Sequence, residues 1–147
     1  MLLLEVMKRI KWSDQYKVHL PEIDAEHRSL YHTTEMLQQA VEGEAGNERI
    51  AAILQEAFTH ISGHFAHEER LMEATEFPGG PWHKRQHDAA ARRVMELADR
   101  IRGGDEAAAQ ELVTYMGRWL KDHIGLADRM MAAHLRNWER LHTRMAS

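Results

Sequence analysis

Histidines and carboxylates stand at inward positions of four helical segments, where the repeat requires apolar side chains. Each segment keeps apolar residues three and four positions apart, which is the spacing of one face of an α-helix. Burying an unpaired polar side chain on such a face costs several kcal/mol, so each one needs a partner. The chain must therefore fold so that these side chains meet one another or a shared ligand. They are His27, His64, Glu68, His83, His87 and His123.

Glycine and proline divide the chain into these segments. Breaks at Pro21, Gly43, residues 78–81 and Gly103 leave four long stretches, and none has the alternating pattern of a strand. Short links favour antiparallel neighbours, so the sequence predicts an all-α fold, an antiparallel up-down-up-down four-helix bundle. We expect a single domain over residues 1–147. Its parts are an extended N-terminal arm (1–21), the bundle (about 22–128) and a short C-terminal helix or tail (about 129–147).

Composition excludes several kinds of site and partner. The 147 residues include no cysteine, which rules out disulfides, thiolate zinc sites and iron–sulfur clusters. With a formal net charge of -4, neither nucleic acid nor an anionic membrane is an expected partner. The apolar start of the chain ends at Glu5, too early for a signal peptide or a spanning helix, and we expect a cytoplasmic protein.

Single histidine motifs carry little information here, whereas the whole set does. Eleven histidines in 147 residues give about one His-x-x-x-His pair by chance, and the chain has two, His60/His64 and His83/His87. One inward histidine would most simply be a core residue hydrogen-bonded to its neighbours. Six inward polar residues on four helices favour a metal centre instead.

Asp128 is a seventh candidate, with an unusual spacing. It follows His123 by five residues, which does not place both on one face of a straight helix. A π-bulge or local unwinding, eased by Gly125, would bring the two side chains together. Alternatively, Asp128 caps a helix that begins at Arg129. The sequence leaves both interpretations open.

A ligand count indicates which metal fits. Five imidazoles, two bridging carboxylates and one bridging oxide or hydroxide supply about eleven of the roughly twelve bonds that two octahedral metals need. One position stays open, so one small ligand could bind end-on. Zinc prefers four ligands, and magnesium or calcium prefers more oxygen donors. The set therefore favours iron or manganese.

Four stretches together with Asp128 resemble the hemerythrin family, specifically the single-domain bacteriohemerythrins. The resemblance extends from Trp12 to about Met131, and the stretches are Ile23–His27, His64–Met72, His83–His87 and Trp119–Ile124. It implies two iron ions joined by an oxo or hydroxo bridge. One iron would be saturated and the other would keep the open position. The implied ligands are His83, His87 and His123 for the first, His27 and His64 for the second, and Glu68 and Asp128 as bridges.

The same resemblance implies reversible O2 binding, serving oxygen transport, storage or sensing, without enzymatic activity. Nitric oxide is a further small ligand to consider, and a sensor would need a separate protein partner. A di-iron enzyme of the peroxidase or nitric oxide reductase type, or an iron store, remains the alternative. Oxygen-activating di-iron bundles use two Glu-x-x-His motifs, whereas this chain has one, Glu139/His142, in its tail.

Five apolar side chains lie within a turn of a candidate ligand and are expected to form a water-excluding O2 pocket. Plain core packing is the alternative for them, and both interpretations can hold. These residues are Ile61, Phe65, Trp119, Leu120 and Ile124.

Some positions depart from the family pattern. Ala90 stands where many members carry an aromatic residue, which predicts a wider pocket and faster autoxidation. Glu26 replaces a frequent glutamine, and His19 stands where a small residue is common; we expect neither to touch a ligand. Glu69 is expected on a solvated face. Titratable groups near the open position are then limited to His60 and His67.

Overall fold

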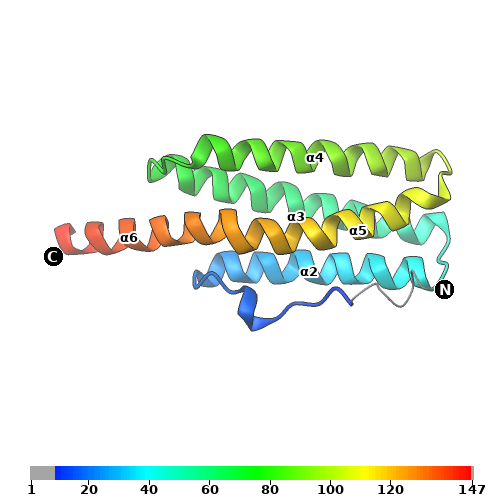
Figure 1. Ribbon diagram of the computed structural model, residues 1–147, viewed down its shortest axis with the longest axis horizontal. Helices are drawn as coiled ribbons and strands as arrows, with labels where there is room; N and C mark the ends of the chain where they lie inside the picture. Colours follow the sequence, from blue (N-terminus) through cyan, green and yellow to red (C-terminus); the bar gives the residue numbers. More distant parts are fainter. Residues whose placement is uncertain (1–8, 147) are drawn as a thin grey trace.

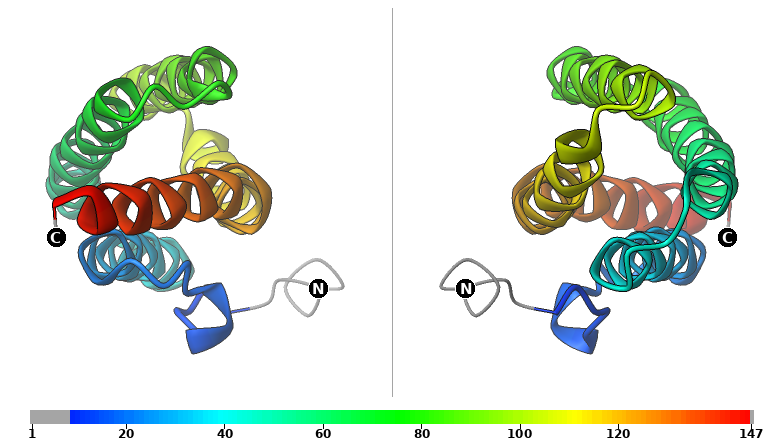
Figure 2. Two further views of the ribbon diagram at one scale, coloured as in Figure 1. Left: turned by 90° about the vertical axis from the view of Figure 1, so that its left-hand side faces the viewer. Right: turned by 90° about the vertical axis from the view of Figure 1, so that its right-hand side faces the viewer.

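Four antiparallel helical rods surround one core in the computed structural model, which describes residues 9–146 (Figure 1). Each rod packs against the next, and the fourth returns to the first, so that the end-on views show a closed ring of helices (Figure 2). The predicted all-α four-helix bundle is confirmed. The four principal helices are α2 (Pro21–Glu42), α3 (Asn47–Ala74), α4 (Gly80–Arg102) and α5 (Glu106–His123).

The helix boundaries follow from local chemistry. Pro21 begins α2, where its missing N–H leaves no hydrogen bond unmade. Gly104 has a φ of 91°, a conformation that favours glycine, and it turns the chain from α4 into α5. The side chain of Asp105 then accepts a hydrogen bond from Ala107 N at 3.0 Å and caps α5. The glycine and proline positions that the sequence marks as breaks therefore lie at helix ends and turns.

The fourth rod continues through a π-helical segment, η2 (Ile124–Asp128), into α6 (Arg129–Ala146). Arg129 keeps helical dihedrals, φ -64° and ψ -41°, so the chain does not restart after Asp128. Of the two interpretations, the π-bulge is confirmed and the helix-cap alternative is wrong. The expected short C-terminal helix is an 18-residue extension that projects beyond the other rods (Figure 1).

The N-terminal arm lies along α2, with a short 3-10 turn, η1 (Asp14–Tyr16). Ile10 N donates to Gln38 Oε1 at 2.9 Å, which ties the arm to the bundle. Asp24 accepts hydrogen bonds from the backbone N–H groups of Val18 (2.7 Å) and His19 (3.1 Å). Part of the expected arm, residues 1–8, lies outside the described residues.

His19 occupies the left-handed region, with a φ of 64°. A side chain is strained there because its Cβ crowds the backbone. Glycine would adopt this conformation without that strain.

The core is apolar along most of the bundle and polar in one layer. Leu97, Leu112 and Leu120 are fully enclosed, and each such burial stabilises the fold by about 1.5–3 kcal/mol. A smaller cluster of Met72, Met131 and Leu135 joins α6 to α3. The enclosed polar layer interrupts this otherwise apolar interior.

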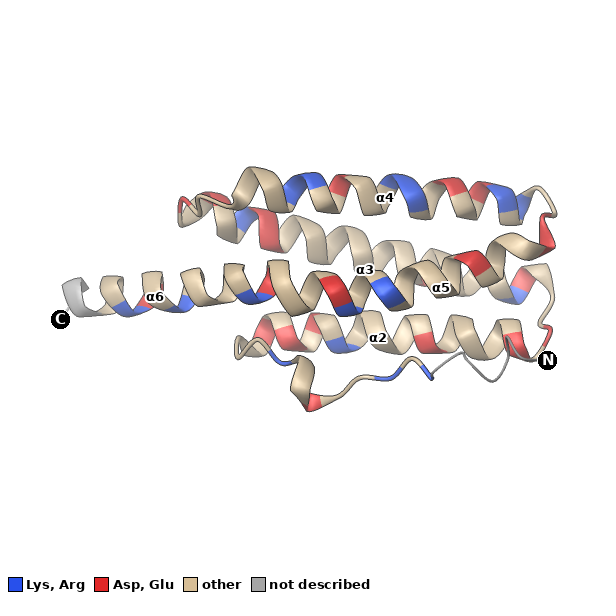
Figure 3. Ribbon diagram, viewed as in Figure 1, with Lys and Arg blue, Asp and Glu red and all other residues tan. Residues whose placement is uncertain are grey.

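The outer surface carries mixed charges. Along α4, Lys and Arg positions are interspersed with Asp and Glu positions (Figure 3). Arg100 reaches across to α5 and contacts Glu111 at 2.8 Å. Within residues 9–146, each helix falls short of the apolar length that a membrane crossing requires.

Candidate metal centre

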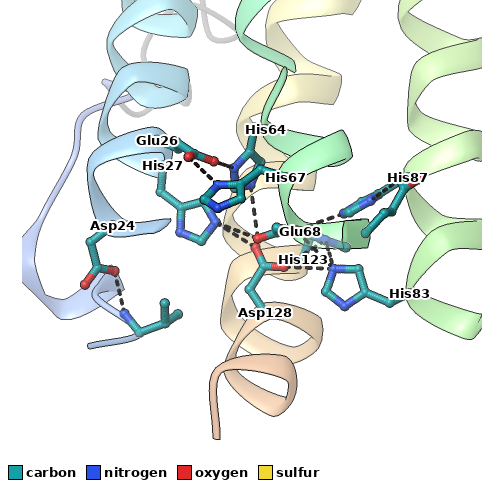
Figure 4. A network of polar contacts seen from close by, with 12 residues as sticks. Asp24, Glu26, His27, His64, His67, Glu68, His83, His87, His123 and Asp128 are labelled. Carbon is teal, nitrogen blue, oxygen red and sulfur yellow. Dashed lines mark hydrogen bonds and ion pairs between the residues drawn. The ribbon is translucent and has the colours of Figure 1, made fainter. Parts of the chain in front are cut away.

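All seven candidate ligands gather in one enclosed layer between the rods (Figure 4). None of them is more than 4% exposed. Every rod contributes: α2 supplies His27, α3 supplies His64 and Glu68, α4 supplies His83 and His87, and the fourth rod supplies His123 and Asp128. The π segment aligns the last two, because its wider turn places residues five apart on one face.

The ligand atoms form two sets that share both carboxylates. Within each set the atoms lie within 4.8 Å of one another, which is close enough to surround a single ion. The sets are unequal, since one has five members and the other four. The larger contains Glu68, His83, His87, His123 and Asp128, and the smaller contains His27, His64, Glu68 and Asp128.

Each carboxylate directs one oxygen to each set. Glu68 Oε2 lies 3.2 Å from His64 Nε2, and its Oε1 lies 3.1 Å from His87 Nε2. Asp128 Oδ2 lies 2.9 Å from His27 Nε2, and its Oδ1 lies 3.0 Å from His83 Nε2. Both side chains are thus placed as bridges between two neighbouring positions.

These close contacts are not hydrogen bonds. Within the described chain, both oxygens of Glu68 and Asp128 and the Nε2 atom of His87 have no hydrogen-bond partner. Nδ1 of His87 donates elsewhere, so its neutral ring presents a lone pair on Nε2 towards carboxylate oxygens. Lone pairs that face each other repel unless a cation lies between them. The donor set therefore fits metal ions, and mixed imidazole and carboxylate donors fit non-heme iron.

Three of the imidazoles are oriented by hydrogen bonds from Nδ1. His64 donates to Glu26 at 2.7 Å, His87 to Glu69 at 2.9 Å, and His123 to the Gln86 side-chain oxygen at 2.9 Å. Such partners hold a ligand ring in position and raise its basicity. The expectations that Glu26 touches no ligand and that Glu69 is merely solvated are therefore wrong.

The signal for these partners lies in the sequence, next to the ligands themselves. Glu26 precedes His27, Glu69 follows Glu68, and Gln86 precedes His87. On a helix, a residue beside an inward ligand lies at the margin of the buried face, from which it can reach a ligand of the neighbouring rod. These neighbours are not at inward positions, so the apolar repeat alone does not predict their contacts with the ligands.

The two other candidate titratable groups lie outside the cluster. His67 Nδ1 donates to Glu26 Oε2 at 2.6 Å, so His67 reaches the site only through that carboxylate. His60 Nδ1 instead lies 3.0 Å from Thr33 Oγ1. Burial raises the pKa of Glu26, but its hydrogen bonds to both histidines outweigh this effect and lower the pKa overall.

The electrostatics of the layer also favour positive charge. Burial by itself lowers the pKa of His64, yet the charge of Glu68 and the hydrogen bond to Glu26 raise it to about 10. Burial opposes protonation of His83 too, but Asp128 and Glu68 raise its pKa to about 9. Against the effect of burial, the surrounding histidines hold the pKa of Glu68 well below its usual range. A metal that binds here displaces protons from the imidazoles.

The five predicted pocket residues lie around this layer. Phe65 stacks on His87, with 3.9 Å between ring centroids, and Trp119 stacks on His123 at 4.2 Å. Ile61, Leu120 and Ile124 are at most 5% exposed. Their role as an O2 pocket stays a prediction. Ala90 is buried, as the helical phase of α4 predicts.

Comparisons with known proteins agree with this centre. Residues 18–135 match the family model described as the hemerythrin HHE cation binding domain. The chain is 32% identical to a bacteriohemerythrin of Stenotrophomonas maltophilia over 92% of this chain and 90% of that protein. It is 30% identical to one of Pseudomonas paraeruginosa (80% and 76%) and 29% identical to a myohemerythrin of Riftia pachyptila (82% and 88%). The chain belongs to the hemerythrin family.

Proposed function

We propose that this protein binds O2 reversibly at a non-heme di-iron centre. The observation that carries the proposal is the division of the Glu68 and Asp128 oxygens between two sets of histidines. Two carboxylates shared in this way suit two metal ions a short distance apart, joined by an oxo or hydroxo group. Membership of the hemerythrin family supports iron as the metal and O2 as the ligand.

The unequal sets support one open position. Three histidines and two bridging carboxylates would complete the coordination of the first iron, together with the oxo or hydroxo bridge. The second iron would be held by His27 and His64 with the same bridges, leaving one position for a small molecule. When bound, the two ferrous ions supply the electrons that hold O2 reversibly. Nitric oxide is a further candidate ligand for that position.

The surrounding residues favour binding over turnover. Five neutral imidazoles donate less negative charge than the four carboxylates of oxygen-activating bundles, so high-valent iron is less stabilised. Phe65 and Leu120 are buried and Trp119 is half-buried, and their apolar side chains limit the access of water, which hinders the protonation that would release a reduced oxygen species. We therefore propose a carrier, store or sensor of O2 and not an enzyme. A sensing role would require a separate protein partner.

A cycle of reduction and oxygenation tests this function. The iron-loaded protein is reduced without air, exposed to O2 and then flushed with inert gas, while its visible spectrum is recorded. A colour change that reverses through several cycles is the expected result. Irreversible oxidation with continued O2 consumption would instead indicate an enzyme, and an unchanged spectrum would leave an iron store.

Glu68→Gln is the variant that tests the bridge. It keeps the size of the side chain and removes its charge, so we expect loss of bound iron and of the spectral change. Glu73→Gln on the same helix is the matched control, because Glu73 is exposed. Equal iron content in the two variants would overturn the assignment of Glu68.

A further inference from the structure

A small cavity lies in the apolar core, apart from the polar layer. Its volume is about 20 Å³, enough for one molecule the size of water. All four principal helices line it, including Leu30 and Thr33 from α2, Ile61 from α3, Val94 from α4 and Met116 from α5. The cavity thus lies between the four rods of the bundle.

The lining offers no free polar group to a ligand. Its hydroxyls belong to Thr33 and Thr34. Thr34 Oγ1 donates to Leu30 O at 2.8 Å, and Thr33 Oγ1 lies 3.0 Å from both Ser29 O and His60 Nδ1. Both hydroxyls are therefore engaged in other contacts, and the remaining wall is hydrocarbon. A water needs two to four polar partners, whereas an apolar gas molecule needs none.

The cavity lies at the same distance from the metal centre along all four helices. Each helix contributes a lining residue that is seven residues, about two helical turns, from one of its candidate ligands, always towards the same end of the bundle. Seven residues span about 10 Å along a helix axis. The four pairs are Thr34 with His27, Ala57 with His64, Val94 with His87 and Met116 with His123.

The near end of the cavity faces the smaller ligand set. Leu30 and Ile61 line it and lie only three residues from His27 and His64, the proposed ligands of the open iron. At the same level, α4 carries Ala90, which has no side chain beyond Cβ. Leu30 and Ile61 are therefore the side chains that lie between the cavity and the open position.

We propose that this cavity is a second, metal-independent binding site for small apolar gas molecules, and that O2 passes through it to the open position of the di-iron centre. The gas site follows from the lining alone. The route rests on the proposed function, since it requires O2 binding at the iron.

Gas binding is tested with krypton, an apolar atom of about the width of O2. Crystals of the diferric protein are exposed to pressurised krypton, and the atom is located by its anomalous scattering. We expect a krypton site in the wild type and none in Ala57→Leu, which fills the cavity from α3 with a good helix former. Ala52→Leu is the control, because it makes the same change at an exposed position of α3.

The route is tested by mixing the diferrous protein with O2 in a stopped-flow instrument. In Ala57→Leu we expect O2 association and dissociation to slow several-fold together, leaving O2 affinity unchanged, because a path alters rates and not equilibria. Ala52→Leu should retain wild-type rates. If Ala57→Leu fails to fold, Val94→Ile narrows the same cavity by one methyl group.

The krypton and stopped-flow experiments test the gas site and the O2 route separately. No krypton in the wild-type cavity would overturn the gas site. Krypton lost from Ala57→Leu with O2 rates unchanged would overturn the route. If no variant, including the wild type, forms an O2 adduct, then the proposed function and the route both fail, while a krypton site would still establish gas binding.

Discussion

His64 donates a 2.7 Å hydrogen bond from Nδ1 to Glu26, whose other oxygen accepts from His67. The residue at position 26 thus acts on a proposed ligand of the open iron through a charged contact. A carboxylate partner makes the imidazole a stronger donor and favours the ferric state. Glu26 can therefore affect the properties of the site, although it is not itself a ligand.

Glu26→Gln should keep both irons and raise the reduction potential of the centre. The amide oxygen can still accept from His64, but the negative charge is lost, so the ferrous state gains relative stability. Spectroelectrochemical titration measures the potential, and iron analysis checks the loading. Glu22→Gln, a nearby exposed change, should leave the potential unaltered. An unshifted potential in Glu26→Gln would assign Glu26 a purely steric role.

Asp128→Asn should sharply weaken iron binding. The substitution preserves shape but removes the charge of a proposed bridge that contacts His27 and His83 at 2.9 and 3.0 Å. Removing a hydrogen-bond partner of a metal ligand typically lowers metal affinity about 10–100-fold. Removing the charge of a bridging ligand should lower the iron affinity at least as much. Competition with a chelator gives the affinity. Asp122→Asn, exposed on α5, should bind iron normally.

The metal-free protein should lose stability as pH rises. The pKa values of His64 and His83 are raised from 6.5 to about 10 and about 9, so the folded state binds extra protons. Their contribution is fully present below pH 6.5 and is lost as pH rises through about 9 to 10. At about 1.4 kcal/mol per pKa unit, the loss is on the order of several kcal/mol.

The carboxylates act at the opposite end of the pH range. The pKa of Glu68 lies well below 4.5, so its stabilising effect is present above that pH and is lost as pH falls. Urea unfolding of metal-free protein should therefore give greatest stability between about pH 4.5 and 6.5. Iron-loaded protein, whose imidazoles cannot protonate, is the control. A flat pH profile for metal-free protein would contradict these shifts.

Ala90→Phe should lengthen the lifetime of the O2 adduct. The larger ring would close space at the level of Leu30 and Ile61 and keep water from the centre. Overpacking costs about 1–3 kcal/mol, so melting temperature must be recorded beside the autoxidation rate. Ala89→Phe, at an exposed position, is the matched control. A lifetime equal to that of the wild type would mean that Ala90 does not determine autoxidation.

The sequence by itself determined the bundle and its inward faces. Helical periodicity and the Gly and Pro breaks were sufficient because they depend on local backbone preferences and on a repeat that each segment carries alone. The same repeat identified His27, His64, Glu68, His83, His87 and His123 as inward residues, and the structure buries them all.

Other features depended on how the rods meet. Asp128 was ambiguous because a five-residue spacing suits a cap or a π-bulge equally, and only packing against His27 and His83 decided between them. The sequence predicts that Glu26 touches no ligand and that Glu69 is solvated, and both predictions fail because the partners of these residues lie on another helix. The core cavity arises from the register of four rods. Contacts between distant segments are set by tertiary packing, which no local pattern encodes.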